Sequence, residues 1–232
     1  MTARKGPSVE TASRVRARWR AAAPSQSSEA LFAALPAKLR PPQPRVNLIE
    51  RRALLGALGE TKAPLVVLCA PAGAGKTTVL RQWAESDERP FAWVQLDQAD
   101  SDPVVLLSYL ALALEPITDV DPSVKASLSL AVPPIRERIL PLLGEALAAA
   151  PGFVLVLDDA HLLSGDKPWE VVAFVLRNLP DGAQLALGSR SDPELPLARM
   201  RAAGDVAEFR AAELSLLRHE VAELMRLHDC EA

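Results

Sequence analysis

The sequence of 232 residues lacks long hydrophobic runs, a large net charge and a rich set of cysteines. Its longest apolar segments, 65–70 and 153–157, are far shorter than the roughly 20 residues that span a bilayer, so no membrane segment is expected. The basic residues near the N-terminus precede no apolar stretch typical of a secretory signal. The net charge of −3 gives no overall basic character that would favour nucleic-acid binding.

The two cysteines, Cys69 and Cys230, lie far apart in the sequence. Cys69 ends an apolar segment that resembles a buried strand, which favours a reduced structural thiol over a disulfide. Together with the missing signal and membrane span, this predicts a cytoplasmic protein. The sequence contains no internal repeat that would indicate a solenoid or an array.

The beginning of the chain differs in composition from the rest. Residues 1–20 carry six basic side chains against Glu10 alone, and four prolines cluster between positions 36 and 44. This composition is typical of a solvated, disordered tail followed by an extended linker; an arm that touches nucleic acid is the alternative. Residues 1–45 are therefore predicted to be a tail and linker, and residues 46–232 one folded domain.

Strand-like and helix-like segments alternate along the predicted domain. Short apolar runs predict strands at 65–70, 91–96, 153–157, 185–188 and 206–209. Periodic apolar positions predict helices at 48–58, 76–86, 103–114, 133–149 (kinked at Pro141), 168–179 and 217–228. The segment 116–130 is ambiguous. Alternation of this kind implies right-handed crossovers, and therefore an α/β fold with a mainly parallel sheet between two layers of helices.

The most informative segment is LVVLCAPAGAGKTT at 65–78. Gly73 and Gly75 allow the backbone angles that point N–H groups at a polyphosphate, and the helix that starts near Gly75 directs its positive end at the same anion. Lys76 would reach the β- and γ-phosphates, and the Thr77 hydroxyl would coordinate Mg²⁺. The predicted phosphate-binding residues are Ala72, Gly73, Ala74, Gly75, Lys76, Thr77 and Thr78.

This loop departs at one position from the common pattern G-x-x-x-x-G-K-[ST], because Ala70 stands where the pattern has glycine. Alanine is small enough for the loop to close. The alternative interpretation is an ordinary helix start after a glycine-rich turn, with Lys76 in solvent.

A second apolar strand ends in two carboxylates, Asp158 and Asp159. Buried carboxylates are costly without a cation or another partner. We expect this strand to lie beside the strand that leads into the loop, with Asp158 facing Mg²⁺ and Asp159 holding or deprotonating the attacking water. An Asp is one methylene shorter than the Glu that many ATPases use here, so we expect slow hydrolysis. Alternatively, Asp159 caps the following turn.

Two further polar residues lie near the same predicted edge of the sheet. Arg190 follows the strand at 185–188 and could bind a γ-phosphate and report its presence; a surface ion pair is the alternative. His161 has no partner at metal-ligand spacing, so a zinc site is not expected, and a hydrogen bond within its turn is predicted.

Together these segments resemble the nucleotide-binding domain of the large LuxR-type ATP-binding regulators, the maltose-activator branch of the STAND P-loop ATPases. The resemblance covers about residues 40–228. It rests on APAGAGKTT at 70–78, FAWVQLD at 91–97, DSDP at 100–103, LVLDDAHLL at 155–163 and LGSR at 187–190. The segment LIERRALL at 48–55 is also similar to the helix that lies near the adenine in that family.

The resemblance implies an ATP-driven switch that binds Mg²⁺ and ATP, self-associates in the ATP-bound state and resets by slow hydrolysis. It assigns the phosphates to Gly73, Gly75, Lys76 and Thr77, the metal to Asp158, the water to Asp159 and the γ-phosphate sensor to Arg190. Such regulators continue into a winged helix, a sensor array and a LuxR-type helix-turn-helix. This chain is therefore expected to be truncated after the ATPase core, without the sensor and DNA-binding domains.

A departure from the family lies at Leu217, where a Thr or Ser usually caps the last helix. We therefore expect no capping box with Glu220.

The leading hypothesis is an ATP- and ADP-binding switch domain that hydrolyses slowly at most, that associates with itself or with the missing domains, and that makes no direct contact with DNA or a membrane. A stand-alone AAA-like ATPase is the first alternative. A nucleotide-independent interaction module or remnant is the second.

Overall fold

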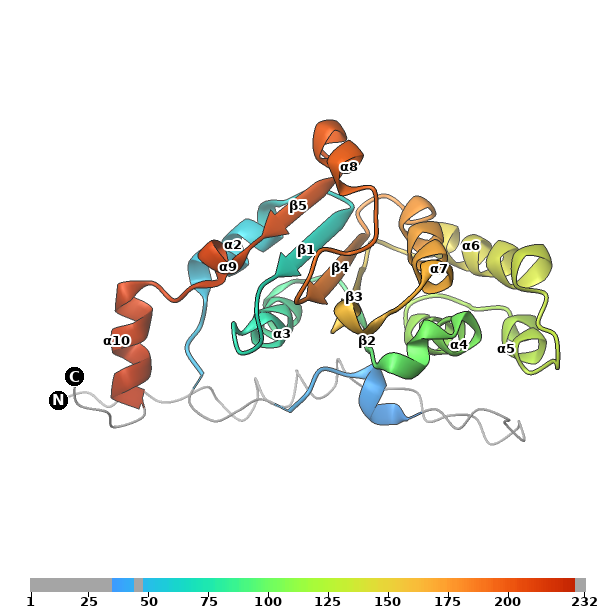
Figure 1. Ribbon diagram of the computed structural model, residues 1–232, viewed down its shortest axis with the longest axis horizontal. Coiled ribbons are helices and arrows are strands. Elements are labelled where there is room, and N and C mark those ends of the chain that lie inside the picture. The colour runs from blue at the N-terminus through green and yellow to red at the C-terminus, as the bar shows by residue number, and fades with distance from the viewer. Residues whose placement is uncertain (1–34, 44–47, 228–232) are drawn as a thin grey trace.

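The computed structural model describes residues 35–43 and 48–227 of the chain. Its centre is a parallel five-stranded sheet in the order β2-β3-β4-β1-β5 (Figure 1). The strands are β1 (Leu65–Cys69), β2 (Phe91–Gln95), β3 (Val154–Asp158), β4 (Gln184–Ser189) and β5 (Val206–Phe209). The predicted α/β fold with a parallel sheet is confirmed.

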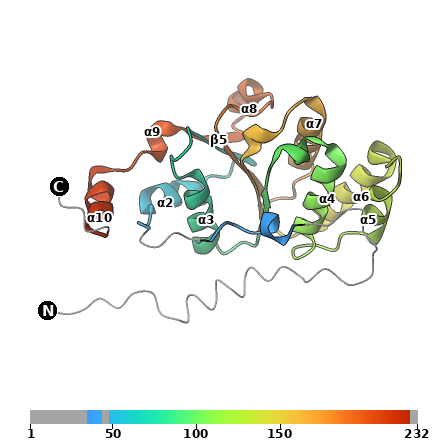
Figure 2. The ribbon, with the colours of Figure 1, turned by 60° about the horizontal axis from the view of Figure 1, so that its bottom comes forward.

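Helices cover both faces of this sheet and complete a three-layer arrangement (Figure 2). One face carries α2 (Arg52–Glu60), α3 (Lys76–Ser86) and the short α9 (Ala211–Leu214). The other carries α4 (Pro103–Leu114), α5 (Pro122–Leu128), α6 (Leu140–Ala149), α7 (Asp166–Arg177) and α8 (Leu197–Ala203). The last helix, α10 (Arg218–Leu227), stands away from the sheet (Figure 1).

Alternate side chains of β1 enter the two halves of the core. Leu65 and Val67 pack with the α4–α8 layer, whereas Val66 and Leu68 pack with α2 and α3, and all four are fully buried. A strand covered on both faces has no solvent-facing positions, which explains its uninterrupted apolar sequence. The loop after β1 therefore lies at the carboxyl edge of the sheet, where open α/β folds bind ligands.

Several element boundaries differ from the prediction. The first helix begins at Arg52 and not at Leu48, although Leu54 and Leu58 are buried as expected. Helices α8 and α9 were not predicted, and the ambiguous segment 116–130 contains α5. The predicted kink takes the form of a π-helical turn, η3 (Ile135–Ile139), directly before α6. Pro141 lies in the first turn of α6, directly after the π-helical turn, so its missing N–H falls where the helical hydrogen-bond pattern changes.

Residues 35–43, which their composition assigned to a linker, pack against the folded part. The short helix η1 (Pro36–Leu39) lies against β2 and α4. Lys38 Nζ donates to Asp100 Oδ2 at 2.6 Å, and both residues are buried. The same Nζ lies 3.1 Å from Asp97 Oδ2 and 4.2 Å from the centre of the Tyr109 ring. An extended linker is therefore the wrong description of these residues, because the partners of Lys38 come together only in the folded structure.

Residues 1–34 of the predicted tail and linker lie outside the described residues, as does Cys230, and the boundary near residue 45 stays a prediction. Cys69 is buried and free, as expected. Within the described part of the chain, no helix is both long and apolar enough to cross a membrane.

Candidate nucleotide-binding site

The loop between β1 and α3 has the backbone that its glycines predict. Gly73 and Gly75 have φ angles of 81° and 82°, in the left-handed region that favours glycine. Gly75 is the N-cap of α3, and no side chain caps this end of the helix. The free N–H groups of the first turn and the positive end of the helix dipole therefore face the loop, an arrangement that suits an anion.

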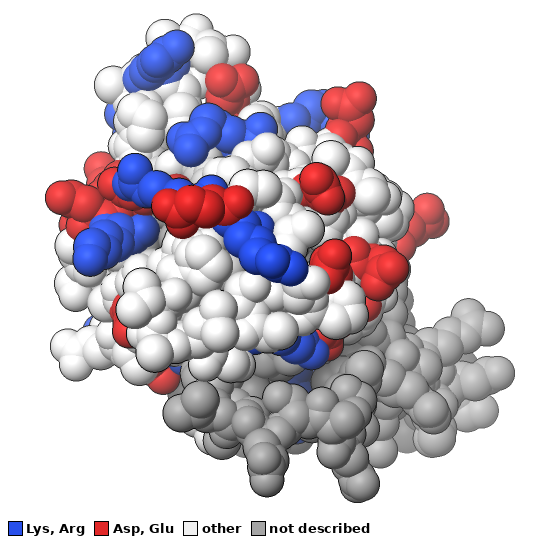
Figure 3. Space-filling model, turned by 90° about the vertical axis from the view of Figure 1, so that its right-hand side faces the viewer, with Lys and Arg blue, Asp and Glu red and all other residues white. Residues whose placement is uncertain are grey.

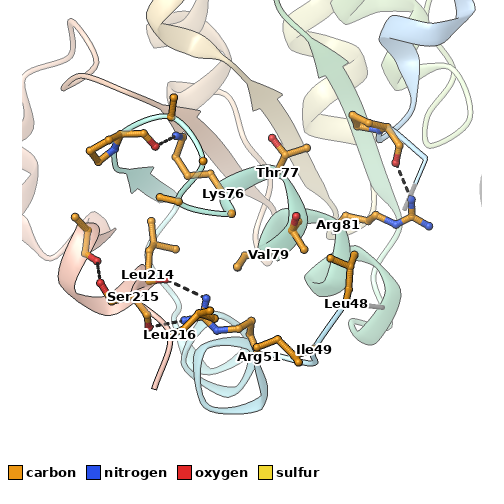
Figure 4. A pocket seen from close by; sticks show the side chains of 18 of the residues that line it. Leu48, Ile49, Arg51, Lys76, Thr77, Val79, Arg81, Leu214, Ser215 and Leu216 are labelled. Atoms are coloured by element: carbon orange, nitrogen blue, oxygen red, sulfur yellow. Dashed lines mark hydrogen bonds between the residues drawn. The ribbon is translucent and has the colours of Figure 1, made fainter. Parts of the chain in front are cut away.

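The alternative interpretation of the loop placed Lys76 in solvent, but the side chain is buried. It is 7% exposed, and its Nζ donates to the carbonyl oxygens of Ala70 at 2.7 Å and Pro71 at 3.0 Å (Figure 4). Burial lowers the pKa of Lys76, and the nearby carboxylates of Asp158 and Asp159 oppose this shift. The ammonium group is thus folded back over the loop, held by two neutral acceptors.

Thr77 and Asp158 meet although Thr77 lies in α3, which follows β1, and Asp158 ends β3, a strand that is not adjacent to β1. The Thr77 hydroxyl donates to Asp158 Oδ2 at 2.6 Å, and the backbone N–H of Asp159 donates to Asp158 Oδ1 at 3.0 Å. Asp158 is completely buried. Burial is the largest influence on its pKa and raises it above the ordinary value, against the lowering effect of the Thr77 hydrogen bond.

The expectation that the Asp158 strand lies beside the loop strand is wrong. Strand β1 pairs with β4 and β5, and β4 separates it from β3. Asp158 nevertheless reaches Thr77 by extending across β4. The predicted proximity was correct for the side chains even though the predicted strand order was not.

Asp159 adopts a left-handed conformation, with φ 59° and ψ 36°, directly after β3. Its side chain does not cap the following turn. Instead, Asp159 Oδ2 accepts a hydrogen bond from Gln95 Nε2 at 2.6 Å, and Oδ1 lies 3.9 Å from His161 Nδ1. The left-handed backbone turns this carboxylate toward the pocket, where Asp159 forms part of the lining.

A hydrogen bond within its turn was predicted for His161, and the Nδ1 atom of the imidazole does not form one. That atom is buried and has no hydrogen-bond partner among the described residues. Burial lowers the pKa of His161, and the nearby Asp159 carboxylate opposes the shift. A neutral imidazole in this position adds no charge to the site.

Arg190 lies in the loop after β4 and is exposed. It lines the same pocket as Asp159 and the phosphate-loop residues. Among the described residues, Arg190 forms no ion pair, in contrast to the surface-pair alternative. The loop that carries it is shaped by Ser189, whose hydroxyl donates to the Ser191 carbonyl at 2.6 Å.

A pocket of about 920 Å³ is lined on one side by Lys76, Thr77, Asp159 and Arg190 and on its far side by an apolar region, whereas Asp158 is not among the lining residues. Figure 4 shows Lys76 and Thr77 along one side, and Ile49, Arg51, Leu214 and Leu216 along the other. A volume of this size suits a ligand as large as a nucleotide. Its polyphosphate would lie at the loop, and its base would lie between Ile49 and Leu216.

The family model described as "AAA ATPase domain" matches residues 47–187, which include the loop, Asp158 and all but the end of β4. The chain belongs to the AAA ATPase domain family. Its sequence is also similar to curated regulators, each of which is an "HTH-type transcriptional regulator MalT". The MalT of Yersinia enterocolitica is 30% identical over 199 residues, which are 84% of this chain and 22% of that protein.

The MalT of Vibrio parahaemolyticus is 33% identical over 174 residues, or 72% of this chain and 19% of that protein. The chain thus spans about a fifth of the length of these relatives. A solved structure of C. elegans PCH-2 aligns at 14% identity and a TM-score of 0.36, covering 69% of this chain and 39% of that one. The resemblance to the ATPase domain of maltose-activator regulators is confirmed by the family match and the MalT relatives.

The far wall of the pocket in this AAA ATPase domain depends on Arg51, which sequence reasoning missed. Arg51 is 6% exposed and donates to the carbonyl oxygens of Leu214 at 3.0 Å and Ser215 at 2.9 Å. Its Nε lies 3.2 Å from Glu220 Oε1. The segment before α2 is thereby joined to residues 163 or more positions later in the chain. Two consecutive arginines, Arg51 and Arg52, were visible in the sequence, but nothing there indicated which one is buried.

Glu220 corrects the expectation at the start of α10. Leu217 has no hydroxyl to cap the helix, yet Glu220 Oε2 accepts a hydrogen bond from the Leu217 N–H at 2.8 Å. Half of a capping box is therefore present. The Glu220 carboxylate that forms this half also pairs with Arg51, so the helix cap and the pocket wall depend on a single buried group.

Two further features of the site were not predicted. Gln95, the last residue of β2, holds Asp159; a polar residue at the end of an apolar strand was the available signal. Pro42 and Gln43 line the outer side of the pocket, and Arg81 of α3 donates to the Pro42 carbonyl at 2.6 Å (Figure 4). The segment that begins with η1 therefore continues to the edge of the nucleotide-sized pocket.

The donor set at the loop fits Mg²⁺. Thr77 and Asp158 supply hydroxyl and carboxylate oxygens, the ligands that a hard cation prefers, and the buried Asp158 carboxylate lacks a cationic hydrogen-bond partner among the described residues. The described part of the chain contains no cluster of three or more His, Cys, Asp or Glu that could bind a metal alone.

Basic and acidic side chains are interspersed on the face shown in Figure 3. Several basic groups on the described surface are paired with carboxylates, among them Arg136 with Glu170 at 2.7 Å and Arg201 with Glu208 at 2.5 Å.

Proposed function

We propose that this chain binds Mg²⁺ and ATP, or ADP, between the phosphate loop and the wall formed by residues 48–51 and 214–216. The observation that carries the proposal is the convergence of Lys76, Thr77 and Asp158 on one glycine-bent loop at the N-terminus of α3. Hydrolysis is slow at most, and the bound nucleotide acts as a switch within a larger MalT-like regulator.

The phosphate oxygens are bound by the backbone N–H groups of residues 72–78 and by Lys76. In the described conformation Lys76 donates to two carbonyl oxygens at the mouth of the loop. An anion in the loop offers the ammonium a charged acceptor in place of a neutral one, and charge-assisted hydrogen bonds are roughly twice as strong. Thr78, next to Thr77 in the first turn of α3, adds its N–H and hydroxyl.

The metal is bound by the Thr77 hydroxyl and the Asp158 carboxylate. When bound, Mg²⁺ neutralises charge on the β- and γ-phosphates. The hydrogen bond between Thr77 and Asp158 holds the two oxygens next to each other, so the protein supplies a prearranged pair of ligands. The raised pKa of Asp158 reflects burial without a cation, a cost that a bound cation removes.

Asp159 positions or deprotonates the attacking water, and Arg190 contacts the γ-phosphate. Both line the pocket on the loop side. Gln95 donates a hydrogen bond to one oxygen of Asp159, and the Asp side chain is one methylene shorter than the Glu that many ATPases use here. Both features favour slow turnover, so that the bound nucleotide persists and reports a state.

We assign the folded unit to residues 46–232 and residues 1–45 to an N-terminal extension whose last part docks through Lys38. The partners are ATP and ADP, a second copy of the chain, and sensor and helix-turn-helix domains like those of the regulators. The chain itself makes no direct DNA contact and resides in the cytoplasm. A stand-alone AAA-like ATPase is the second candidate, because Asp159 and Arg190 both reach the pocket.

Isothermal titration with ATP and Mg²⁺ tests the proposal on the wild-type chain and on Lys76→Ala. Loss of a charged hydrogen-bond donor should weaken binding about 10- to 100-fold, since such bonds contribute about 1.5–3 kcal/mol. Lys62→Ala is the matched control, because Lys62 is exposed and outside the pocket. Equal affinities for the two variants would refute the proposed site. Steady turnover that Asp159→Asn abolishes would favour the stand-alone ATPase.

A further inference from the structure

Gly188 occupies the point at which Asp158 crosses the sheet. In β4, Gly188 pairs with Leu68 of β1. On the other side of β4, Leu187 pairs with Leu157 of β3, so Gly188 and Asp158 are the next residues along their strands. Side chains at paired positions of neighbouring strands point to the same face of a sheet. A side chain at 188 would therefore point to the face on which Asp158 reaches toward Thr77.

The space at Gly188 is filled by the Asp158 carboxylate. A Cβ atom added to Gly188 would lie 2.2 Å from Asp158 Oδ1 and 3.3 Å from its Cγ. The remaining one of the three nearest atoms is Leu80 Cδ1 at 3.1 Å, the end of a side chain, which is a much less severe approach than that of Asp158 Oδ1. Backbone strain is not the reason for glycine, because Gly188 is not among the residues with positive φ.

We propose that Gly188 is a positioning residue for the metal-binding carboxylate. Its missing side chain opens the path by which Asp158 on β3 reaches across β4 to Thr77 on α3. This inference rests on the proposed function in assigning the carboxylate to Mg²⁺, but the steric relation between Gly188 and Asp158 holds without any nucleotide.

Asp158 cannot avoid an added methyl group and keep its contacts. It is completely buried, with Oδ1 fixed by the Asp159 N–H at 3.0 Å and Oδ2 by the Thr77 hydroxyl at 2.6 Å. Moving Oδ1 away from a Cβ at 188 rotates or withdraws the carboxylate, which breaks at least one of the two hydrogen bonds. The paired metal ligands then no longer point at the same place.

A double-mutant cycle in the absence of nucleotide tests the steric relation. Urea unfolding is measured for the wild type, Gly188→Ala, Asp158→Ala and the double variant. We expect Gly188→Ala to lower the folding equilibrium constant at least tenfold in the wild-type background and less than threefold in the Asp158→Ala background. Gly56→Ala is the control, because a Cβ there meets no atom within 4 Å.

If Gly188→Ala lowers the folding equilibrium constant equally in the wild-type and Asp158→Ala backgrounds, the inference is overturned. The glycine is then required for packing against Leu80. If Gly188→Ala alone does not fold, the double variant decides the matter: recovery of folding supports the inference, and failure to fold contradicts it. Leu80→Ala combined with Gly188→Ala should give no such recovery.

A second measurement links the position to the metal. The Mg²⁺ concentration that half-maximally enhances ADP binding should rise at least tenfold in Gly188→Ala, while metal-free ADP affinity stays within threefold of the wild type. If the metal-free ADP affinity falls as much as the required Mg²⁺ concentration rises, a positioning role for Gly188 is contradicted. If the wild type binds no nucleotide, the proposed function fails, and the unfolding cycle still decides whether Gly188 makes room for Asp158.

Discussion

Removing Arg51 should release the C-terminal wall of the pocket. Arg51→Met leaves Glu220 buried without its cationic partner and leaves the Leu214 and Ser215 carbonyl oxygens without donors. The side chains of Arg51 and Glu220 are only 7% and 6% exposed, so water screens the pair poorly. Breaking one partner of a buried pair costs about 3–5 kcal/mol, which corresponds to at least a hundredfold change in an opening equilibrium.

The cost should appear locally, because α10 stands away from the sheet and can open without unfolding the core (Figure 1). Hydrogen exchange under native conditions measures it: we expect protection of the amides of α9 and α10 to fall about a hundredfold or more, with β1, β3 and β4 unchanged. Nucleotide affinity should fall with it, since Leu214, Ser215 and Leu216 line the pocket.

The neighbouring arginine provides a matched control. The Arg52 side chain is 85% exposed, and its partner Glu50 is also exposed, so Arg52→Met should leave the protection of α9 and α10 close to that of the wild type. Adding Glu220→Gln to Arg51→Met removes the unpaired charge and should restore most of the lost protection. Equal effects of the two arginine variants would refute the assignment of Arg51 as the tie between the two ends of the domain.

Two other charged contacts give predictions of known sign. Lys38→Met leaves Asp100 buried without its cation and should cost about 1–3 kcal/mol in urea unfolding, less than a sealed pair because η1 lies at the surface; a cost no larger than that of Lys62→Met would contradict the docking of η1. Hydrogen bonds from Arg201, assisted by Arg210, lower the pKa of Glu208 from 4.5 to about 2. The Glu208 contribution to stability is therefore present above pH 4.5 and is lost as the pH falls toward 2. The urea midpoints of the wild type and Glu208→Gln should converge over that range. A difference that stays constant with pH would show that the ion pairs of Glu208 with Arg201 and Arg210 do not cause it.

The sequence was sufficient to predict the conformation of the loop and the start of the helix after it, because these depend on local backbone properties. Gly73 and Gly75 require left-handed angles, and Lys76 and Thr77 follow them at fixed positions in the first turn of a helix. Strand existence was equally legible, since strands buried on both faces are continuous apolar runs.

Relations between distant segments could not be predicted in the same way. Strand order depends on which crossover places β4 between β3 and β1, and the apolar runs of the three strands are nearly interchangeable. For the same reason, the importance of Gly188 was hidden: it is set by the Asp158 carboxylate on another strand and not by its own backbone angles.

The burial of two charged side chains was also not predicted from the sequence. Arg51 and Lys38 lie in segments that their sequence makes look polar and exposed, yet each is neutralised by a carboxylate far along the chain, Glu220 and Asp100. Burial of a charge is decided by whether such a partner arrives in the fold. A single sequence does not contain that information.

The measurement that tests the central claim most directly is the amide NMR spectrum of the 232-residue chain during titration with ATP and Mg²⁺. Binding at the loop predicts saturable shifts concentrated at residues 72–78 and at Asp158 and Asp159, with smaller shifts at residues 48–51 and 214–216. The Lys76→Ala variant should lose these shifts at the same ligand concentration. Saturable shifts located elsewhere, or no shifts in the loop at millimolar ATP, would contradict the account.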